Sequence, residues 1–150
     1  MVLEGEKAPE FELVGSDGKK HTLKEFRGKT LVLYFYPKDD TPGCTTEAKN
    51  FNKKLDEVRA FGAEVIGVSK DDTKSHEKFC NKYSLNFLLL SDPDSSMIKS
   101  YGAYGDRGIF GMGTLRKTYI IDKNGKISKI FEKVKPDKHD VEVLDFLKTL

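Results

Sequence analysis

The sequence predicts an α/β fold: a three-layer sandwich around a central mixed sheet, with a hairpin near the N-terminus. Short apolar runs alternate with amphipathic segments over the first two thirds of the chain, and a second hairpin pattern and a closing helical segment follow. Strand–helix–strand alternation produces parallel strands covered by helices, whereas a hairpin adds antiparallel strands. The length of 150 residues fits a single domain spanning 1–150.

The first half of the chain supplies a hairpin, a central strand and a long helix. FELVGSDGKKHTLKEF predicts a hairpin that turns at Asp17-Gly18. Residues 30–36 are apolar throughout, as expected of a strand that is covered on both faces. A helix is predicted from about 42 to 60, because apolar residues recur there at helical spacing. These residues are Phe51, Leu55 and Val58.

The second half completes the sheet and ends in a helix. The remaining predicted elements are strands at 63–69 and 87–92, helices at 73–83, 94–101 and about 137–149, and a hairpin turning at Asn124-Gly125. The glycine-rich stretch YGAYGDRGIFGMG is predicted to be a loop. The final helix would bury Val141, Leu144 and Leu147 on one face. This order of elements fits a thioredoxin-like fold.

Composition excludes several classes of function. The formal net charge is +2 and the basic residues are scattered, so we expect no nucleic-acid partner. MVLEGEKAPEF has no apolar core of a signal peptide and no apolar run is long enough to span a bilayer, so we expect a cytoplasmic protein with no membrane partner. Two cysteines do not make a disulfide scaffold, and we expect reduced, catalytic thiols.

The stretch Thr41-Pro42-Gly43-Cys44 follows the apolar strand and begins the long predicted helix. Thr41 is a favourable N-cap, and Pro42 is favoured at the first helical position. Cys44 therefore lies in the first turn, where unpaired backbone N–H groups and the helix dipole stabilise an anion. It also lies just past the carboxyl end of a central strand, where open α/β sheets place their sites.

This position favours the thiolate form of Cys44. A free cysteine with a pKa near 8.5 is only ~3% ionised at pH 7. Cysteines at helix N-termini beside cationic groups have pKa values of about 3.5–7.5. Most cysteines are instead small buried hydrophobes, but a packing residue needs neither the cap nor the glycine beside Cys44. The sequence therefore indicates an activated thiol.

The motif Pro37-x-x-x-Thr41-x-x-Cys44 resembles the peroxidatic motif of peroxiredoxins. The longer string LVLYFYPKDDTPGCTTEA resembles the bacterioferritin-comigratory, or Q-type, branch of that family. The likeness continues through GEKAPEFEL, LLLSD, YGAYG and R-x-T-Y-I-I-D-x-x-G-K. The resemblance implies a thiol peroxidase that reduces hydrogen peroxide and organic hydroperoxides and is recycled by thioredoxin or a similar dithiol reductant.

The resemblance also implies roles for individual residues. Cys44 would be the peroxidatic nucleophile, and Arg116 would hold its thiolate and polarise the peroxide. Thr41 would hydrogen-bond the peroxide, and Pro37 would shield the thiolate from water. The residues implied to bind the peroxide are thus Pro37, Thr41, Gly43 and Arg116. Donors placed in advance can stabilise the negative charge that develops on the leaving oxygen.

Each of these residues also has a purely structural interpretation. Thr41 would cap the helix whether or not it contacts substrate. Pro37 could only end the strand, and Arg116 could be a surface residue of a strand. Glu47 could orient Arg116 or could be a first-turn acidic residue favoured by the helix dipole. The residues alone leave these alternatives open.

The chain departs from the Q-type pattern at Lys49. Many members carry a resolving cysteine at that position, so a disulfide of that spacing is impossible here. A subset keeps the resolving cysteine on the helix predicted at 73–83, and the resemblance therefore implies an intramolecular Cys44–Cys80 disulfide. We expect one or both of the segments near 41–47 and 73–83 to open locally when the bond forms, and the polar helix at 73–83 has few apolar anchors to prevent it. The alternative is a one-cysteine enzyme resolved by an external thiol, with Cys80 a packing residue.

The three histidines suggest no further chemistry. His21, His76 and His139 are all remote from Cys44 in sequence, so spacing does not indicate a Cys–His pair. His76 precedes Cys80 by one helical turn and could assist that thiol or form half of a metal site. We predict instead a solvated histidine on the helix, and we expect no metal and no cofactor.

Two other functions on the same fold compete with the peroxidase. A general disulfide oxidoreductase would need Cys-x-x-Cys, but Glu47 stands where the second cysteine would be. A non-enzymatic partner-binding module would require an inert Cys44 with a pKa above about 8. Because an intramolecular disulfide lets one chain complete its cycle, we expect a monomer.

Overall fold

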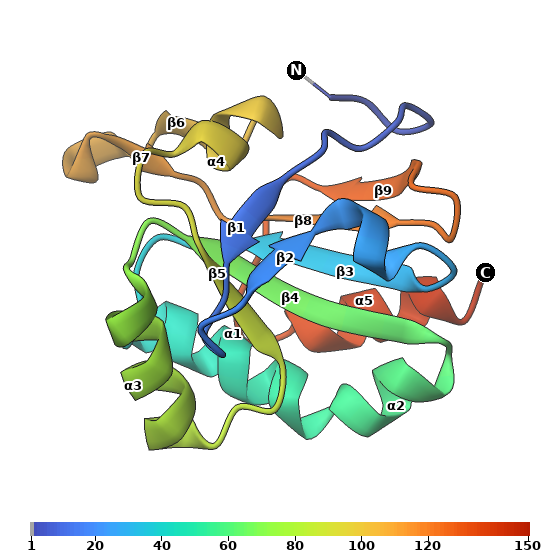
Figure 1. Cartoon of the computed structure of the whole chain (residues 1–150), viewed down its shortest axis with the longest axis horizontal. Coiled ribbons are helices and arrows are strands. Elements are labelled where there is room, and N and C mark those ends of the chain that lie inside the picture. Colours follow the sequence, from blue (N-terminus) through green and yellow to red (C-terminus); the bar gives the residue numbers. More distant parts are fainter. Residues whose placement is uncertain (1) are drawn as a thin grey trace.

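The computed structural model describes residues 2–150 and is built around a five-stranded mixed sheet with the order β5-β4-β3-β8-β9 (Figure 1). Its strands are β3 (Thr30–Phe35), β4 (Ala63–Ser69), β5 (Leu88–Ser91), β8 (Lys117–Ile121) and β9 (Ile127–Phe131). The strands β3, β4 and β5 run parallel, and β8 pairs antiparallel with both β3 and β9. All six residues of β3 are buried, which explains its unbroken apolar sequence.

Helices and hairpins cover the two faces of the sheet (Figure 1). One face carries α1 (Pro42–Lys53), α2 (Leu55–Ala60), α3 (Thr73–Tyr83) and α5 (His139–Leu147). The other face carries η1 (Leu23–Phe26), α4 (Ser96–Ser100), and the hairpins β1 (Glu12–Val14) with β2 (Lys20–Thr22) and β6 (Tyr104–Asp106) with β7 (Met112–Thr114). The predicted three layers and N-terminal hairpin are therefore present. None of the helices in residues 2–150 is long and apolar enough to cross a membrane.

The two predicted hairpin turns lie where expected. The β1–β2 turn places Gly18 at φ +78°, and the β8–β9 turn places Gly125 at φ +83°. Both values are in the left-handed region that glycine adopts without steric cost. The hairpin β6–β7 was missed, since its strands are three residues each and lie within the stretch predicted as a glycine-rich loop. Its tip is the short 3-10 helix η2 (Gly108–Phe110).

Two helix predictions need correction. The helix predicted at 42–60 is interrupted at Lys54, which has ψ +3°, so α1 and α2 are separate elements. No glycine or proline marks this break in the sequence. In α5, Val141 is 51% exposed, whereas Val143 is fully buried. The buried face of α5 comprises Asp140, Val143, Leu144 and Leu147, the spacing of one helical stripe.

Candidate active site

Cys44 lies in the first turn of α1, behind the carboxyl end of β3, and its residue is only 2% exposed. Thr41 is the N-cap residue and Pro42 begins the helix, as predicted. The Thr41 side chain, however, makes no capping hydrogen bond; its hydroxyl donates to the carbonyl oxygen of Lys38 at 2.8 Å. The expectation that this hydroxyl caps the helix is therefore wrong. The backbone N–H groups of the first turn have no carbonyl partner within the helix, and the Thr41 side chain does not accept a hydrogen bond from them.

Arg116 brings a fixed positive charge to the Cys44 sulfur. Its Nη2 donates to Sγ at 3.3 Å, although the two residues are 72 positions apart. Arg116 lies one residue before β8 rather than on a strand, and its side chain is 18% exposed. The Arg116 side chain, whose direction the sequence left open, therefore points toward the Cys44 thiol.

Gly43 makes room for this contact. A Cβ atom at this position would lie 3.2 Å from Arg116 Nη2 and 3.5 Å from Pro136 Cγ. The first distance is tighter than ordinary van der Waals packing, so a larger residue would require the guanidinium to shift by a few tenths of an ångström. Pro136 was not identified as a neighbour of the site from the sequence, and no local pattern indicates it. It is held there in part by Asn50 of α1, whose amide donates to Pro136 O at 3.4 Å.

Glu47 anchors the other side of the Arg116 guanidinium. Arg116 Nη1 donates to Glu47 Oε1 at 2.8 Å, and the Glu47 side chain is 1% exposed. Of the two interpretations that the sequence left open, this contact supports the one in which Glu47 orients Arg116. Burial raises the pKa of Glu47 to about 7, outweighing the opposite effect of Arg116. The second oxygen, Oε2, has no hydrogen-bond partner among the described residues.

Pro37 and Cys80 complete the set of predicted residues. Pro37 is half-buried in the loop that connects β3 to α1. Cys80 lies on α3, is half-buried and is a free thiol, as is Cys44. Burial raises the pKa of Cys80, and the charge of Asp39 adds to this effect, while a hydrogen bond with Ser16 opposes it. Cys80 packs against the same hydrophobic cluster that contains Cys44.

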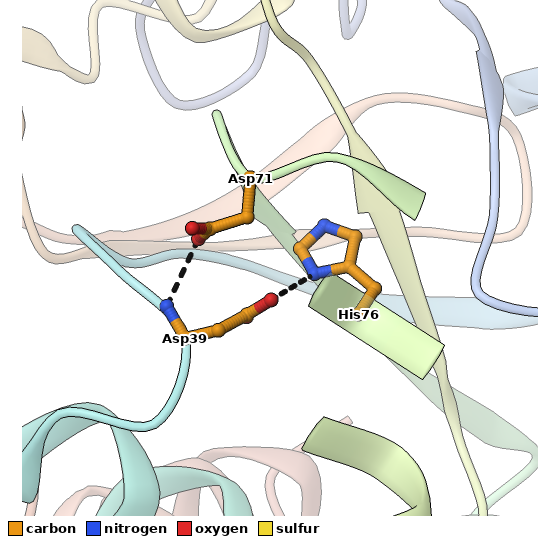
Figure 2. Close-up of side chains that lie close together, drawn as sticks. All are labelled: Asp39, Asp71 and His76. Carbon is orange, nitrogen blue, oxygen red and sulfur yellow. Dashed lines mark hydrogen bonds and ion pairs between the residues drawn. The ribbon is translucent and has the colours of Figure 1, made fainter. Parts of the chain in front are cut away.

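His76 differs from its prediction. It is fully buried rather than solvated, and its ring donates or accepts at both nitrogens. Figure 2 shows it beside the Asp39 carboxylate, with the Asp71 carboxylate at the Asp39 backbone N–H. Ligand atoms of these three residues lie within 4.8 Å of one another, but His76 Nδ1, Asp39 Oδ2 and Asp71 Oδ2 each already bond protein groups. Their hydrogen bonds account for the cluster without a metal.

Comparison with known proteins identifies the family. The model of the AhpC/TSA family matches residues 4–130. The chain belongs to this family. A relative named putative peroxiredoxin bcp, from Helicobacter pylori strain J99, is 45% identical over 146 residues, which cover 95% of this chain and 96% of the relative.

Solved structures agree with this assignment. A Xylella fastidiosa PrxQ variant superposes with a TM-score of 0.95 at 34% identity, covering 99% of this chain and 97% of its own. A Xanthomonas campestris peroxiredoxin Q superposes with a TM-score of 0.89 at 38% identity, covering 93% and 90%. The predicted thioredoxin-like fold is therefore confirmed, and the protein is a peroxiredoxin-family thiol peroxidase.

Proposed function

We propose that this peroxiredoxin reduces hydrogen peroxide and organic hydroperoxides at Cys44. The observation that carries the proposal is the 3.3 Å contact between Arg116 Nη2 and the Cys44 sulfur at the start of α1. The guanidinium and the helix N-terminus both face this sulfur, where they can stabilise negative charge on the reacting atoms. A Xanthomonas campestris bacterioferritin comigratory protein is described as having alkyl peroxide reduction activity, which supports the inclusion of organic hydroperoxides.

In the first step, the Cys44 thiolate attacks the terminal oxygen of the hydroperoxide. A sulfur–oxygen bond forms and the O–O bond breaks, so that sulfur is oxidised by two electrons to sulfenic acid and the peroxide is reduced. The leaving oxygen takes up a proton and departs as water or an alcohol. Arg116 and the first-turn N–H groups would stabilise the charge on the oxygens during this displacement. The Thr41 hydroxyl, which donates to Lys38 O in the resting structure, would turn to donate to the bound peroxide. Pro37 would limit the access of water.

We further propose that Cys80 resolves the sulfenic acid. The Cys80 thiol would attack the Cys44 sulfur, forming a disulfide and releasing the sulfenic oxygen as water. A thioredoxin-type dithiol would then reduce the disulfide, and a single chain would suffice for the cycle. Two Xanthomonas campestris variants each carry one cysteine changed to serine, at positions as far apart in sequence as Cys44 and Cys80. This matching spacing supports Cys80 as the second redox cysteine.

A one-cysteine cycle is the alternative. Cys80 is half-buried with a raised pKa and packs against the core, which is also what a structural cysteine would do. In that case an external thiol would attack the Cys44 sulfenic acid directly. Lys49 stands where many Q-type proteins have a nearer cysteine, so no other thiol of this chain could substitute.

Two serine variants test the proposal. Cys44→Ser should consume no peroxide with either thioredoxin or dithiothreitol as reductant. Cys80→Ser should keep its first fast reaction with peroxide but lose turnover with thioredoxin, and it should form sulfinic acid in excess peroxide. Peroxide consumption by Cys44→Ser at the parent rate would refute the assignment of the nucleophile. Full thioredoxin-dependent turnover by Cys80→Ser would instead favour the one-cysteine cycle.

A further inference from the structure

A buried ion pair connects the two segments that carry the thiols. His76 Nδ1 lies 2.7 Å from Asp39 Oδ2, and the two side chains are 0% and 3% exposed (Figure 2). Asp39 belongs to the loop between β3 and α1, two residues before the Thr41 N-cap. His76 belongs to α3, one helical turn before Cys80. The pair thus joins the start of the Cys44 helix to the Cys80 helix.

The hydrogen bonds of His76 place a proton within this pair. Its Nε2 lies 2.9 Å from the carbonyl oxygen of Leu90, which can only accept, so Nε2 carries a hydrogen. The 2.7 Å contact on the other side therefore requires a second hydrogen between Nδ1 and the Asp39 carboxyl. A single proton shared between Nδ1 and the carboxyl satisfies this contact, so each group compensates the burial of the other.

Asp39 is held by further donors. The Tyr36 hydroxyl donates to its Oδ1 at 2.5 Å, and the Ser75 hydroxyl donates to its Oδ2 at 2.8 Å. Its backbone N–H donates to Asp71 Oδ2 at 2.9 Å. The Asp39 carboxylate can accept from Tyr36, Ser75 and His76 at once, whereas the removal of His76 would leave it buried beside two hydroxyl donors only. The arrangement is therefore stable only while loop and helix stay together.

The same two segments also share contacts at the surface. Lys82 and Tyr83, at the end of α3, donate to the two oxygens of Asp40, each at 2.8 Å. The Lys82 and Asp40 side chains are 57% and 43% exposed, so solvent screens their attraction. The buried pair is consequently the stronger of the two connections, and the exposed pair provides a matched control.

We propose that Asp39 and His76 are positioning residues that hold the two thiol-bearing segments closed and thereby set the rate of disulfide formation. This inference rests on the proposed role of Cys80. Cys80 is half-buried against the core on α3, whereas Cys44 is buried at the start of α1, so we infer that α3 has to open before the two sulfurs can join. Because His76 is one turn away on the same helix, opening of that turn breaks its pair with Asp39. The pair therefore governs whether sulfenic acid becomes disulfide or, in excess peroxide, sulfinic acid.

Two substitutions of His76 separate its two hydrogen bonds. His76→Gln can place an amide near the position of Nε2 and keep the bond to Leu90, but it loses the pair with Asp39. His76→Asn can place an amide near Nδ1 and keep a bond to Asp39. Asp39→Asn changes the other member of the pair, replacing its carboxyl with an amide. It provides the same test if a His76 variant fails to fold. Lys82→Ala removes the exposed contact alone.

The test measures the partition of the sulfenic acid in the full chain, treated with excess hydrogen peroxide in the absence of a reductant, quenched with a thiol-alkylating reagent and analysed by mass. Loss of the buried pair should raise the ratio of disulfide to sulfinic acid by about tenfold in His76→Gln and Asp39→Asn. His76→Asn should lie between these variants and the parent, and Lys82→Ala should match the parent. Equal ratios in the parent, His76→Gln and Asp39→Asn would overturn the proposal.

Hydrogen exchange of the reduced protein provides a readout that does not depend on Cys80 chemistry. Loss of the pair should speed exchange in residues 73–83 and 37–41 together, while exchange in α5 should stay unchanged. If the parent forms no Cys44–Cys80 disulfide, the proposed resolution fails, but faster exchange in both segments would still establish the connection between them. Unchanged exchange in His76→Gln and Asp39→Asn would refute that connection even if the disulfide forms.

Discussion

Arg116 reaches the sulfur of Cys44 across 72 positions of sequence, at 3.3 Å, while its other nitrogen is held by Glu47 at 2.8 Å. The buried carboxyl thus fixes the direction of the guanidinium, and the guanidinium acts on the thiol. Cys44 and Glu47 of α1 and Arg116, one residue before β8, thus form one connected set of contacts. The predictions that follow address this arrangement.

Arg116→Lys should slow the reaction with hydrogen peroxide by about 100-fold, because a lysine keeps the charge but cannot bond Glu47 and the sulfur through one planar group. Competition with a second peroxidase for limiting peroxide would measure this rate. Arg59→Lys is the matched control, since Arg59 forms a surface pair with Glu64 and is 43% exposed. A rate for Arg116→Lys equal to that of the control would show that the contact with Cys44 is not catalytic.

Gly43→Ala should separate activity from stability. The added Cβ would lie 3.2 Å from Arg116 Nη2 and should displace the guanidinium, slowing the peroxide reaction by about tenfold. Gly43 is helical with no positive φ, and alanine favours a helix, so the free energy of unfolding should not fall. Urea unfolding and peroxide kinetics on the same preparation test both statements. Unchanged kinetics would mean that Arg116 accommodates the methyl group without loss of function.

Thr41→Val should affect catalysis rather than folding. The hydroxyl donates to Lys38 O instead of capping α1, so its loss should change the free energy of unfolding by less than about 0.5 kcal/mol. If the hydroxyl turns from Lys38 O to the bound peroxide, its loss should slow the reaction by about tenfold or more, and Thr41→Ser should retain most of the rate. A loss of stability above about 1 kcal/mol, typical of a removed N-cap, would contradict the observed geometry.

Glu47 should make stability depend on pH. Its pKa is about 7 in the folded protein against an ordinary value of 4.5, so between these values the folded state holds a proton that the unfolded chain releases. The free energy of unfolding should therefore fall as the pH rises from about 4.5 to 7, by on the order of 2–3 kcal/mol. In Glu47→Gln, this contribution should be absent. Parallel profiles for the parent and the variant, from urea unfolding between pH 4.5 and 8, would show that Glu47 does not titrate in this range.

Features encoded in neighbouring residues were predictable. The strand, the proline and the position of Cys44 in the first turn depend on a short continuous stretch, and all three are as predicted. The direction of Arg116 required the family resemblance, because its partner is on another element. The capping by Thr41 failed as a prediction because Lys38 O, three residues earlier, accepts the hydroxyl instead.

Other failures have the same physical origin. His76 stands in a polar helical sequence, and the carboxyl that compensates its burial is 37 positions away, so local pattern indicated a solvated residue. For the same reason α3 was expected to have few buried anchors, although His76 and Phe79 are both buried. In α5, whether Val141 or Val143 is buried depends on which face of the helix packs against the sheet. That face also carries the buried Asp140, so its sequence did not look apolar.

The central claim is that Cys44 is the nucleophile that takes up an oxygen atom from the peroxide, and mass analysis after one equivalent of hydrogen peroxide tests it most directly. The reduced protein, treated for seconds and then alkylated and digested, should show Cys44 as the oxidised residue, joined to Cys80 in a disulfide. In Cys80→Ser the same treatment should leave Cys44 as a sulfenic acid that a nucleophilic trap can label. If Cys44 is instead recovered as an alkylated thiol, and so was never oxidised, after the peroxide has been consumed, the account is contradicted.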